Sequence, residues 1–307
     1  MKFNVKSVGV FAMVAVVAIA ASPAWAAGGK AKELKHEHWH FDGIFGTYDA
    51  DAVQRGFQVY QTVCASCHSL DLVAFRNLGD KGGPYHLDAC PAGVPTNIDC
   101  SNPNDNPIVK AIAASYQIQD GPDDSGDMFQ RDGVPSDYFP RPYANDPIAR
   151  LANSGALPPD LSLIIKARHH GPDYVYSLLS GYEAAPETVD VLPGQYYNPY
   201  FPGDMSQNIK SAYLDDEGNV LEGTKVPLGG VLAMAPPLQD GIIDYADPET
   251  PETVEQYSKD VVEFLAWAAE PKMEVRKKLG IVTLLYLIIL SGILYWSYRE
   301  IWSKVEY

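Results

Sequence analysis

The pentapeptide Cys64-Ala65-Ser66-Cys67-His68 constrains the fold more than any other part of the chain. Two cysteines three positions apart, followed at once by histidine, match the attachment site of a c-type haem. The spacing lets two thiols reach the two vinyl groups on one edge of a porphyrin, while the adjacent imidazole comes under the iron. We therefore expect one covalently attached haem c, held by Cys64 and Cys67, with His68 as an axial ligand of the iron.

Two other uses of paired cysteines fit the sequence less well. A thioredoxin-like redox pair needs a surrounding βαβ pattern, which the hydrophobic pattern does not show. A zinc site needs a second pair of ligands, and none follows at a suitable spacing in the sequence.

The N-terminus has the pattern of an export signal. Lys2 and Lys6 precede an uncharged run, Ser7–Ala21, and the small residues of Ala24-Trp25-Ala26 follow. We predict a signal peptide over residues 1–26, with an uncleaved anchor as the alternative. The stretch contains no arginine, which favours bacterial export over a mitochondrial presequence. Export suits the motif, because haem is attached covalently to such motifs outside the cytoplasm.

The C-terminus contains a predicted transmembrane helix. Leu279–Tyr298 has twenty residues without a charge, which span about 30 Å as a helix and so cross the hydrocarbon core of a bilayer. Basic residues are more numerous before this span than after it, contrary to the positive-inside tendency, but export of a large domain overrides that bias. The expected organisation is a signal peptide (1–26), a periplasmic haem domain (27–272), an anchor helix (273–303) and a cytoplasmic tail (304–307), in a bacterial inner membrane.

Composition and patterning predict a mainly α fold with much irregular structure. The 24 prolines and 25 glycines indicate long loops, expected over residues 80–107 and 120–147. The net charge of −16 argues against a nucleic-acid partner. Strand patterns are weak. Helical patterns cover 51–63, 159–168, 173–179 and 254–269, and the last has apolar residues at helical spacing: Val254, Tyr257, Val261, Phe264, Leu265 and Ala268.

A second axial ligand for the iron has to come from elsewhere in the chain. Three methionines lie outside the signal peptide and the membrane surface: Met128, Met205 and Met234. Met234 lies between Gly229-Gly230 and Pro236-Pro237, in a loop that can approach a porphyrin face and then hold a side chain still. We favour Met234 on this ground, with Met205 as the main alternative. Thioether ligation raises the reduction potential of haem iron.

Several longer stretches resemble the cytochrome c1 family, and together they cover nearly the whole mature chain. They are Arg55–Tyr60 (RGFQVY), Ser136–Pro140 (SDYFP), Gly155–Ser162 (GALPPDLS), Asp173–Leu179 (DYVYSLL), Tyr197–Gly203 (YNPYFPG), Met234–Pro237 (MAPP) and Phe264–Pro271 (FLAWAAEP).

The resemblance implies a class I cytochrome c-like haem domain in the electron-transfer subunit of the cytochrome bc1 complex, the quinol–cytochrome c oxidoreductase. Its implied partners are cytochrome b, a Rieske iron–sulfur protein as electron donor, and a soluble or membrane-bound c-type cytochrome as acceptor. It also implies that Met234 is an axial ligand and that Arg150 contacts a haem propionate. The segment Asp204–Gly230 is longer than in mitochondrial relatives, which keeps Met205 open as the ligand.

Such a carrier needs no general acid, base or nucleophile, so we expect no catalysis by the isolated chain. Two alternatives come from other classes of protein. One is a membrane-anchored haem enzyme with an open iron site, which would bind carbon monoxide when reduced. The other is a structural anchor subunit, in which loss of the haem ligands would leave electron flow through the complex intact.

Four smaller features carry separate expectations. Cys90 and Cys100 are expected to form a disulfide in an oxidising compartment. Gly56 is expected to allow a close helix crossing, with Phe264 and Trp267 packed against it. We expect the N-terminal segment with His36, His38 and His40 to be solvated rather than a metal site. Acidic clusters at 120–127, 215–222 and 244–263 are expected to form an acidic exterior that steers a basic soluble partner.

Overall fold

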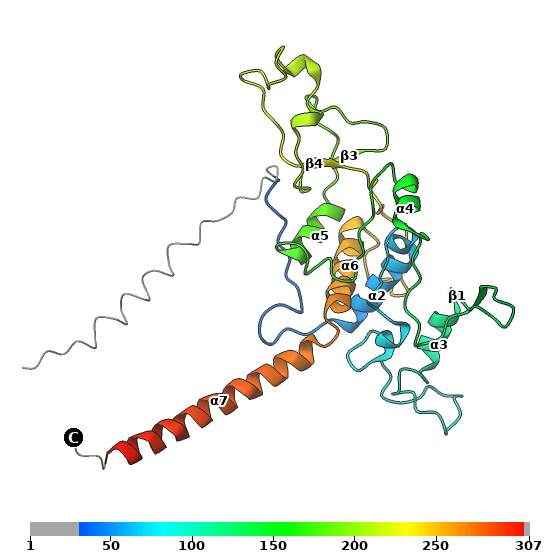
Figure 1. The fold of residues 1–307 in the computed structure, drawn as a ribbon, viewed down its shortest axis with the longest axis vertical. Coiled ribbons are helices and arrows are strands. Elements are labelled where there is room, and N and C mark those ends of the chain that lie inside the picture. The colour runs from blue at the N-terminus through cyan, green and yellow to red at the C-terminus, as the bar shows by residue number, and fades with distance from the viewer. Residues whose placement is uncertain (1–30, 304–307) are drawn as a thin grey trace, which may run out of the picture.

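The computed structural model describes residues 31–303, so the expected signal peptide (1–26) and tail (304–307) lie outside the described residues. The described chain is mainly α-helical, as the sequence predicts, with a few short strands and long loops (Figure 1). The helices are α2 (Ala50–Thr62), α3 (Pro107–Ala114), α4 (Asp146–Ala152), α5 (Gly171–Leu179), α6 (Val254–Ala269) and α7 (Met273–Trp302). The strands are β1 (Gln117–Asp120), β2 (Phe129–Asp132), β3 (Tyr196–Asn198) and β4 (Gly230–Leu232).

The crossing of α2 and α6 organises the core. A Cβ atom built on Gly56 would lie 1.9 Å from the carbonyl oxygen of Asp260 and 2.7 Å from the Cβ of Phe264, so the backbones approach this closely only over a glycine. Phe264 therefore packs against Gly56 as expected, and Trp267 stacks on Phe264 with ring centroids 5.8 Å apart. Both aromatic side chains are fully buried.

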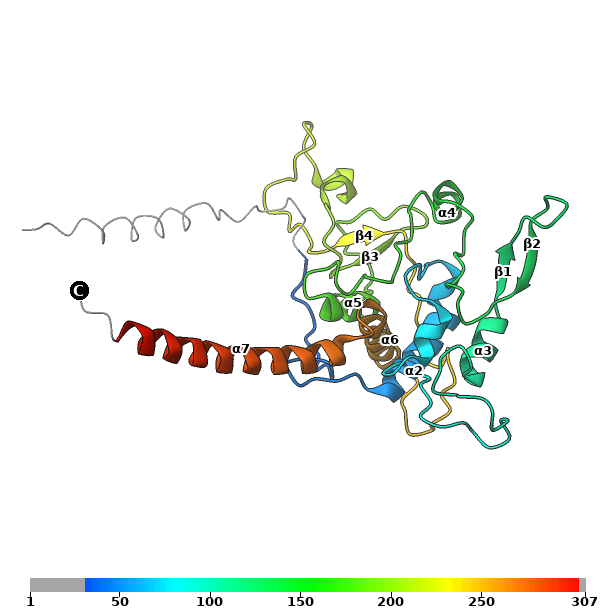
Figure 2. The ribbon, with the colours of Figure 1, turned by 60° about the horizontal axis from the view of Figure 1, so that its bottom comes forward.

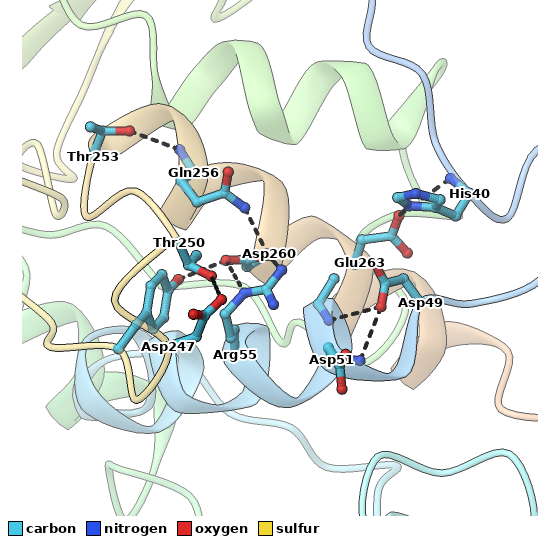
Figure 3. Close-up of polar contacts among 12 residues, drawn as sticks. His40, Asp49, Asp51, Arg55, Asp247, Thr250, Thr253, Gln256, Asp260 and Glu263 are labelled. Carbon is cyan, nitrogen blue, oxygen red and sulfur yellow. Dashed lines mark hydrogen bonds and ion pairs between the residues drawn. The ribbon is translucent and has the colours of Figure 1, made fainter.

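A partly buried ion pair lies at the same crossing (Figure 3). Arg55 donates from Nε and Nη2 to the two carboxylate oxygens of Asp260, at 3.0 and 2.9 Å. Tyr245 and Gln256 donate to the same carboxylate. Asp260 is only 1% exposed, and Glu263 is also buried. The acidic cluster 244–263 is therefore partly internal, which corrects the expectation that it lies on the exterior.

Helix α6 has the bounds that its apolar spacing predicts. Five of the six predicted apolar positions are buried, and Val254 at the first position is partly buried and packs against the core. Helix α5 packs against another side of α6. Polar residues of α6 are buried as well, because α2 and the N-terminal segment cover the remaining faces.

Residues 159–168 form turns, so the helix predicted there is wrong. The Asp160 carboxylate accepts from the backbone N–H of Ser162. It also accepts from Ser69 and Asp71, beside the cysteine motif, which ties the segment to another part of the chain. Tertiary contacts thus override the local apolar spacing.

Two antiparallel pairs of strands stand apart from the helical core. Strand β1 pairs with β2, and Gln117 lies opposite Asp132. Strand β3 pairs with β4, and Asn198 lies opposite Gly230. The β1–β2 pair lies between α3 and α4 in the sequence. Strand β2 falls within the loop predicted over residues 120–147, and α4 begins at the end of that loop.

The N-terminal segment is docked on the helices, although His36, His38 and His40 themselves are exposed to solvent, as expected. Trp39 Nε1 donates to Asp173 Oδ1 at 2.8 Å, and His36 Nδ1 lies 2.7 Å from Asp173 Oδ2. His40 contacts the buried Glu263 through its backbone N–H and its ring (Figure 3). His36 and His40 make these contacts, and no cluster suited to a metal ion occurs within residues 31–303.

Helix α7 leaves the domain as a single long rod (Figures 1 and 2). Its 30 residues contain the uncharged run predicted to cross a membrane, and by length and composition it is long and apolar enough to do so. The apolar side chains of that run are exposed, and the contacts between α7 and the rest of the described chain are made by its first two turns, before the run begins.

Candidate haem site

The cysteine motif begins directly after α2. Thr62 ends the helix, and Cys64–Ser66 form one turn of 3₁₀ helix. The backbone N–H groups of Cys67 and His68 both donate to the carbonyl oxygen of Cys64, at 3.1 and 2.9 Å. This turn holds both sulfur atoms and the imidazole on one short segment. Neither Cys64 nor Cys67 is joined in a disulfide, so both sulfur atoms can bond to another group.

His68 is held in a single tautomer. Its Nδ1 atom lies 2.8 Å from the carbonyl oxygen of Pro159, and because a carbonyl can only accept, the proton resides on Nδ1. The Nε2 lone pair is then available to a metal ion. Burial lowers the pKa of His68 despite this hydrogen bond, which favours the neutral imidazole.

The segment that orients His68 is itself fixed by three contacts to the chain after the motif. Ser69 Oγ and the Asp71 N–H donate to Asp160 Oδ2, at 2.9 and 2.8 Å. The Leu72 N–H donates to Ser162 Oγ at 3.0 Å. Sequence reasoning assigned no role to Pro159 or Asp160, although both lie in the Gly155–Ser162 stretch of the family resemblance.

Large apolar side chains are exposed beside the motif. Leu72 lies four residues after His68, while Leu157 and Leu163 lie on either side of Pro159 and Asp160 in the sequence, and all three face solvent. Apolar side chains gathered in this way indicate a surface that a ligand covers. Two free thiols, a neutral imidazole with Nε2 available and exposed apolar residues are the donors and surroundings that a covalently attached haem requires. The residues fit haem c.

Met234 follows the β3–β4 pair in a fixed loop. Its carbonyl oxygen accepts from the Tyr182 hydroxyl at 3.0 Å, and its side chain is partly exposed. Gly229, which precedes β4, has φ +99°, and a Cβ there would lie 2.4 Å from the carbonyl oxygen of Asn198. In Figures 1 and 2 the motif-bearing end of α2 is turned toward α4 and the β3–β4 pair.

The two other methionines lie in different surroundings. Met205 is 4% exposed and packs with Val189 and Tyr197 in a small apolar cluster separate from the main core. Met128 is exposed in the loop that joins β1 to β2. Of the three, Met234 alone combines a partly exposed side chain with a loop held by the β3–β4 pair.

Arg150 lies on α4, capped at its N-terminus by the side chain of Asn145. The guanidinium is exposed, and Nη1 donates to the carbonyl oxygen of Gly155 at 3.3 Å. Helix α4 lies close to the motif-bearing end of α2 (Figure 2). The expected contact with a haem propionate stays a prediction.

Cys90 and Cys100 are joined by a disulfide, with Cα atoms 5.1 Å apart. The bridge closes a loop of the 80–107 segment, away from the haem motif along the chain. Of the four cysteines in the described chain, two therefore form this disulfide and the two of the motif are not disulfide-bonded.

Comparisons with known proteins point to one family. The sequence profile of the Cytochrome C1 family matches residues 39–305. Cytochrome c1 of Blastochloris viridis is 37% identical over 326 residues, covering 100% of this chain and 99% of that protein. A mitochondrial cytochrome c1 heme protein of Arabidopsis thaliana is 42% identical over 270 residues, covering 87% of this chain and 72% of that protein. Cytochrome b/c1 of Bradyrhizobium diazoefficiens is 42% identical over 284 residues, but the chain spans only 35% of its length.

Proposed function

This chain belongs to the cytochrome c1 family, and on that premise we propose that it is the electron-transfer subunit of a quinol–cytochrome c oxidoreductase, the cytochrome bc1 complex. Proteins of this family carry covalently attached haem c, which supplies one-electron redox chemistry when bound. The observation that carries the proposal is the fixed tautomer of His68 beside two free thiols. The partners are cytochrome b and a Rieske iron–sulfur protein.

The chain receives electrons from the Rieske protein and passes them to a soluble or membrane-bound c-type cytochrome. Acidic residues at 120–127 and 215–222 are mostly exposed and support the docking of a basic acceptor. Docking steered by charge is fast and weakens as salt screens the charges. In this role the chain catalyses nothing on its own, because its residues hold a redox group and no substrate.

We assign the axial ligands to His68 and Met234. Pro159 orients the His68 ring, and the loop fixed by Tyr182 and Gly229 holds Met234. The burial of Met205 in its own apolar cluster favours Met234, because Met205 would have to leave that cluster to reach a ligand. Arg150 is assigned to a haem propionate, since a carboxylate removed from water needs a positively charged partner.

The proposed topology places residues 27–272 on the periplasmic side of a bacterial inner membrane, after removal of residues 1–26. Residues 273–303 then anchor the chain by one pass and leave residues 304–307 in the cytoplasm. The exposed apolar surface of α7 and the bacterial relatives support this arrangement.

Electron flow tests the function directly. In membranes containing the complex, addition of a quinol should convert the haem of this chain to its reduced form, which is followed by its c-type absorbance. Removal of the Rieske protein should prevent this reduction. Reduction that persists without the Rieske protein would contradict the proposed donor. Reoxidation by a basic c-type cytochrome should slow as ionic strength rises, and a rate independent of salt would refute charge steering.

A further inference from the structure

A short loop beside the start of α7 has an unusual distribution of apolar side chains. We call residues 41–47 the junction loop. Its ends are closed by a hydrogen bond of 3.0 Å from the Thr47 N–H to the carbonyl oxygen of His40. Gly43 has φ +72°, and a Cβ on Gly46 would lie 2.1 Å from the carbonyl oxygen of Asp42. Both bends thus depend on glycine, and the loop has a fixed shape.

The apolar residues of the junction loop face in two directions. Phe41 points into the protein, where its ring stacks on Trp39 with centroids 5.8 Å apart and also contacts Tyr48. Ile44 and Phe45, at the tip, are 67% and 85% exposed. Isolated exposed apolar residues are common, but an adjacent pair on a rigid tip offers a contact surface.

Direct contacts join the junction loop to the first turns of α7. Lys277 Nζ donates to the carbonyl oxygens of Phe41 and Gly46, at 2.7 and 3.0 Å. The Tyr48 N–H donates to Glu274 Oε1 at 3.1 Å. The orientation of the loop relative to α7 is therefore set by hydrogen bonds rather than by chance proximity. Figures 1 and 2 both show the loop beside the start of α7, on the side of the domain from which α7 leaves.

These contacts place the loop at the depth where the apolar span begins. Lys277 precedes Leu279, the first residue of the uncharged run, by two residues, or about 3 Å along the helix. The headgroup region on each side of a bilayer is roughly 5–8 Å thick, so a tip at the level of Lys277 lies within it. Phe and aliphatic side chains are the residues that insert into this boundary.

We propose that Ile44 and Phe45 insert into the headgroup boundary of the bilayer, as a second contact that fixes the haem domain against the membrane. The proposal rests on the proposed membrane insertion of α7. The occupant is lipid rather than a protein partner, because hydrogen bonds hold the loop beside the first turns of α7, the helix that presents its own apolar side chains to the bilayer. A single transmembrane helix can tilt in the bilayer and carry its domain with it, and a second contact through the junction loop restricts that tilt.

Site-directed spin labelling tests the proposal with the full-length haem-loaded chain in palmitoyl-oleoyl phosphatidylcholine vesicles. A nitroxide on Phe45→Cys should be more accessible to oxygen than to a water-soluble nickel chelate. Leu192→Cys, an apolar site 56% exposed before β3, is the aqueous control, and Ile288→Cys, 67% exposed in α7, is the lipid control. Lys277→Met should return the label at position 45 to water, whereas Lys278→Met removes the same charge and should not.

The outcomes separate this inference from the proposed anchoring. A label at position 45 that behaves like position 192, while position 288 lies in lipid, overturns the inference and leaves the anchor standing. A label that is aqueous in vesicles but protected in the assembled complex also overturns it, in favour of a protein partner. Aqueous labels at both 45 and 288 would overturn the anchor and the inference together.

Discussion

The Nδ1 atom of His68 lies 2.8 Å from the carbonyl oxygen of Pro159, a residue 91 positions further along the chain. This single hydrogen bond leaves Nε2 as the ring nitrogen that is available to a metal ion. The carbonyl stays in place because the neighbouring Asp160 accepts hydrogen bonds from Ser69 and Asp71. Residues distant in the sequence thus orient the imidazole that we propose as an axial ligand.

Removing the Asp160 carboxylate should loosen this arrangement. We expect Asp160→Ala to lower the free energy of unfolding by at least about 2 kcal/mol, because charge-assisted hydrogen bonds contribute roughly 1.5–3 kcal/mol each. Urea unfolding checks this value. Asp124→Ala, which removes an exposed carboxylate from the loop between β1 and β2, should change stability by less than about 0.5 kcal/mol. Equal effects of the two substitutions would refute the role of Asp160.

Replacement of Met234 by leucine should lower the midpoint potential of the chain. Axial ligands tune haem potentials over about 0.8 V, and loss of a thioether removes a ligand that favours reduced iron. Redox titration measures the shift. Met205→Leu is the matched control and should leave the potential unchanged, because Met205 fills an apolar cluster. A lowered potential in Met205→Leu, with none in Met234→Leu, would reverse the assignment.

The crossing of α2 and α6 should not tolerate a methyl group. Gly56→Ala places a Cβ 1.9 Å from the carbonyl oxygen of Asp260, so the helices must move apart. Overpacking of this kind costs about 1–3 kcal/mol, which exceeds the gain of about 1 kcal/mol in helix propensity. Thermal unfolding checks the loss. Gly280→Ala in α7, where the added Cβ has no described atom within 4 Å, should leave the domain's melting temperature unchanged.

The ion pair of Arg131 and Asp137 should contribute less to the free energy of unfolding at acid pH. Arg131 donates to both oxygens of the Asp137 carboxylate, at 2.6 and 3.0 Å, and lowers the pKa of Asp137 in the folded chain. The pair's contribution is fully present above the unfolded pKa of about 3.9 and is lost as pH falls through the lower folded value. The stability difference between the wild type and Asp137→Asn should therefore shrink below about pH 4. A difference that is constant from neutral to acid pH would show that this pair is not its source.

The parts of the fold that sequence patterns predicted are those governed by local spacing. Helix α6 follows from its apolar positions at helical spacing, and the span within α7 follows from an uncharged run. Residues 159–168 have similar apolar spacing, yet Asp160 and Ser162 bind the chain near the motif and prevent a helix. No local rule reports such long-range hydrogen bonds.

The residues of the candidate haem site also fall into those that local spacing identifies and those that it does not. Cys64, Cys67 and His68 are adjacent in the sequence and could be identified from spacing alone. Pro159 could not, because it acts through a backbone carbonyl, which any residue type carries. The docking of His36 and His40 was also missed, since their partners Asp173 and Glu263 lie more than a hundred residues away.

The most direct test of this account is the reduced-minus-oxidised optical spectrum of the purified chain, recorded with and without carbon monoxide. With His68 and Met234 both bound to iron, the chain should give a c-type spectrum that carbon monoxide leaves unchanged. A large shift on adding carbon monoxide, or no haem absorbance at all, would contradict it.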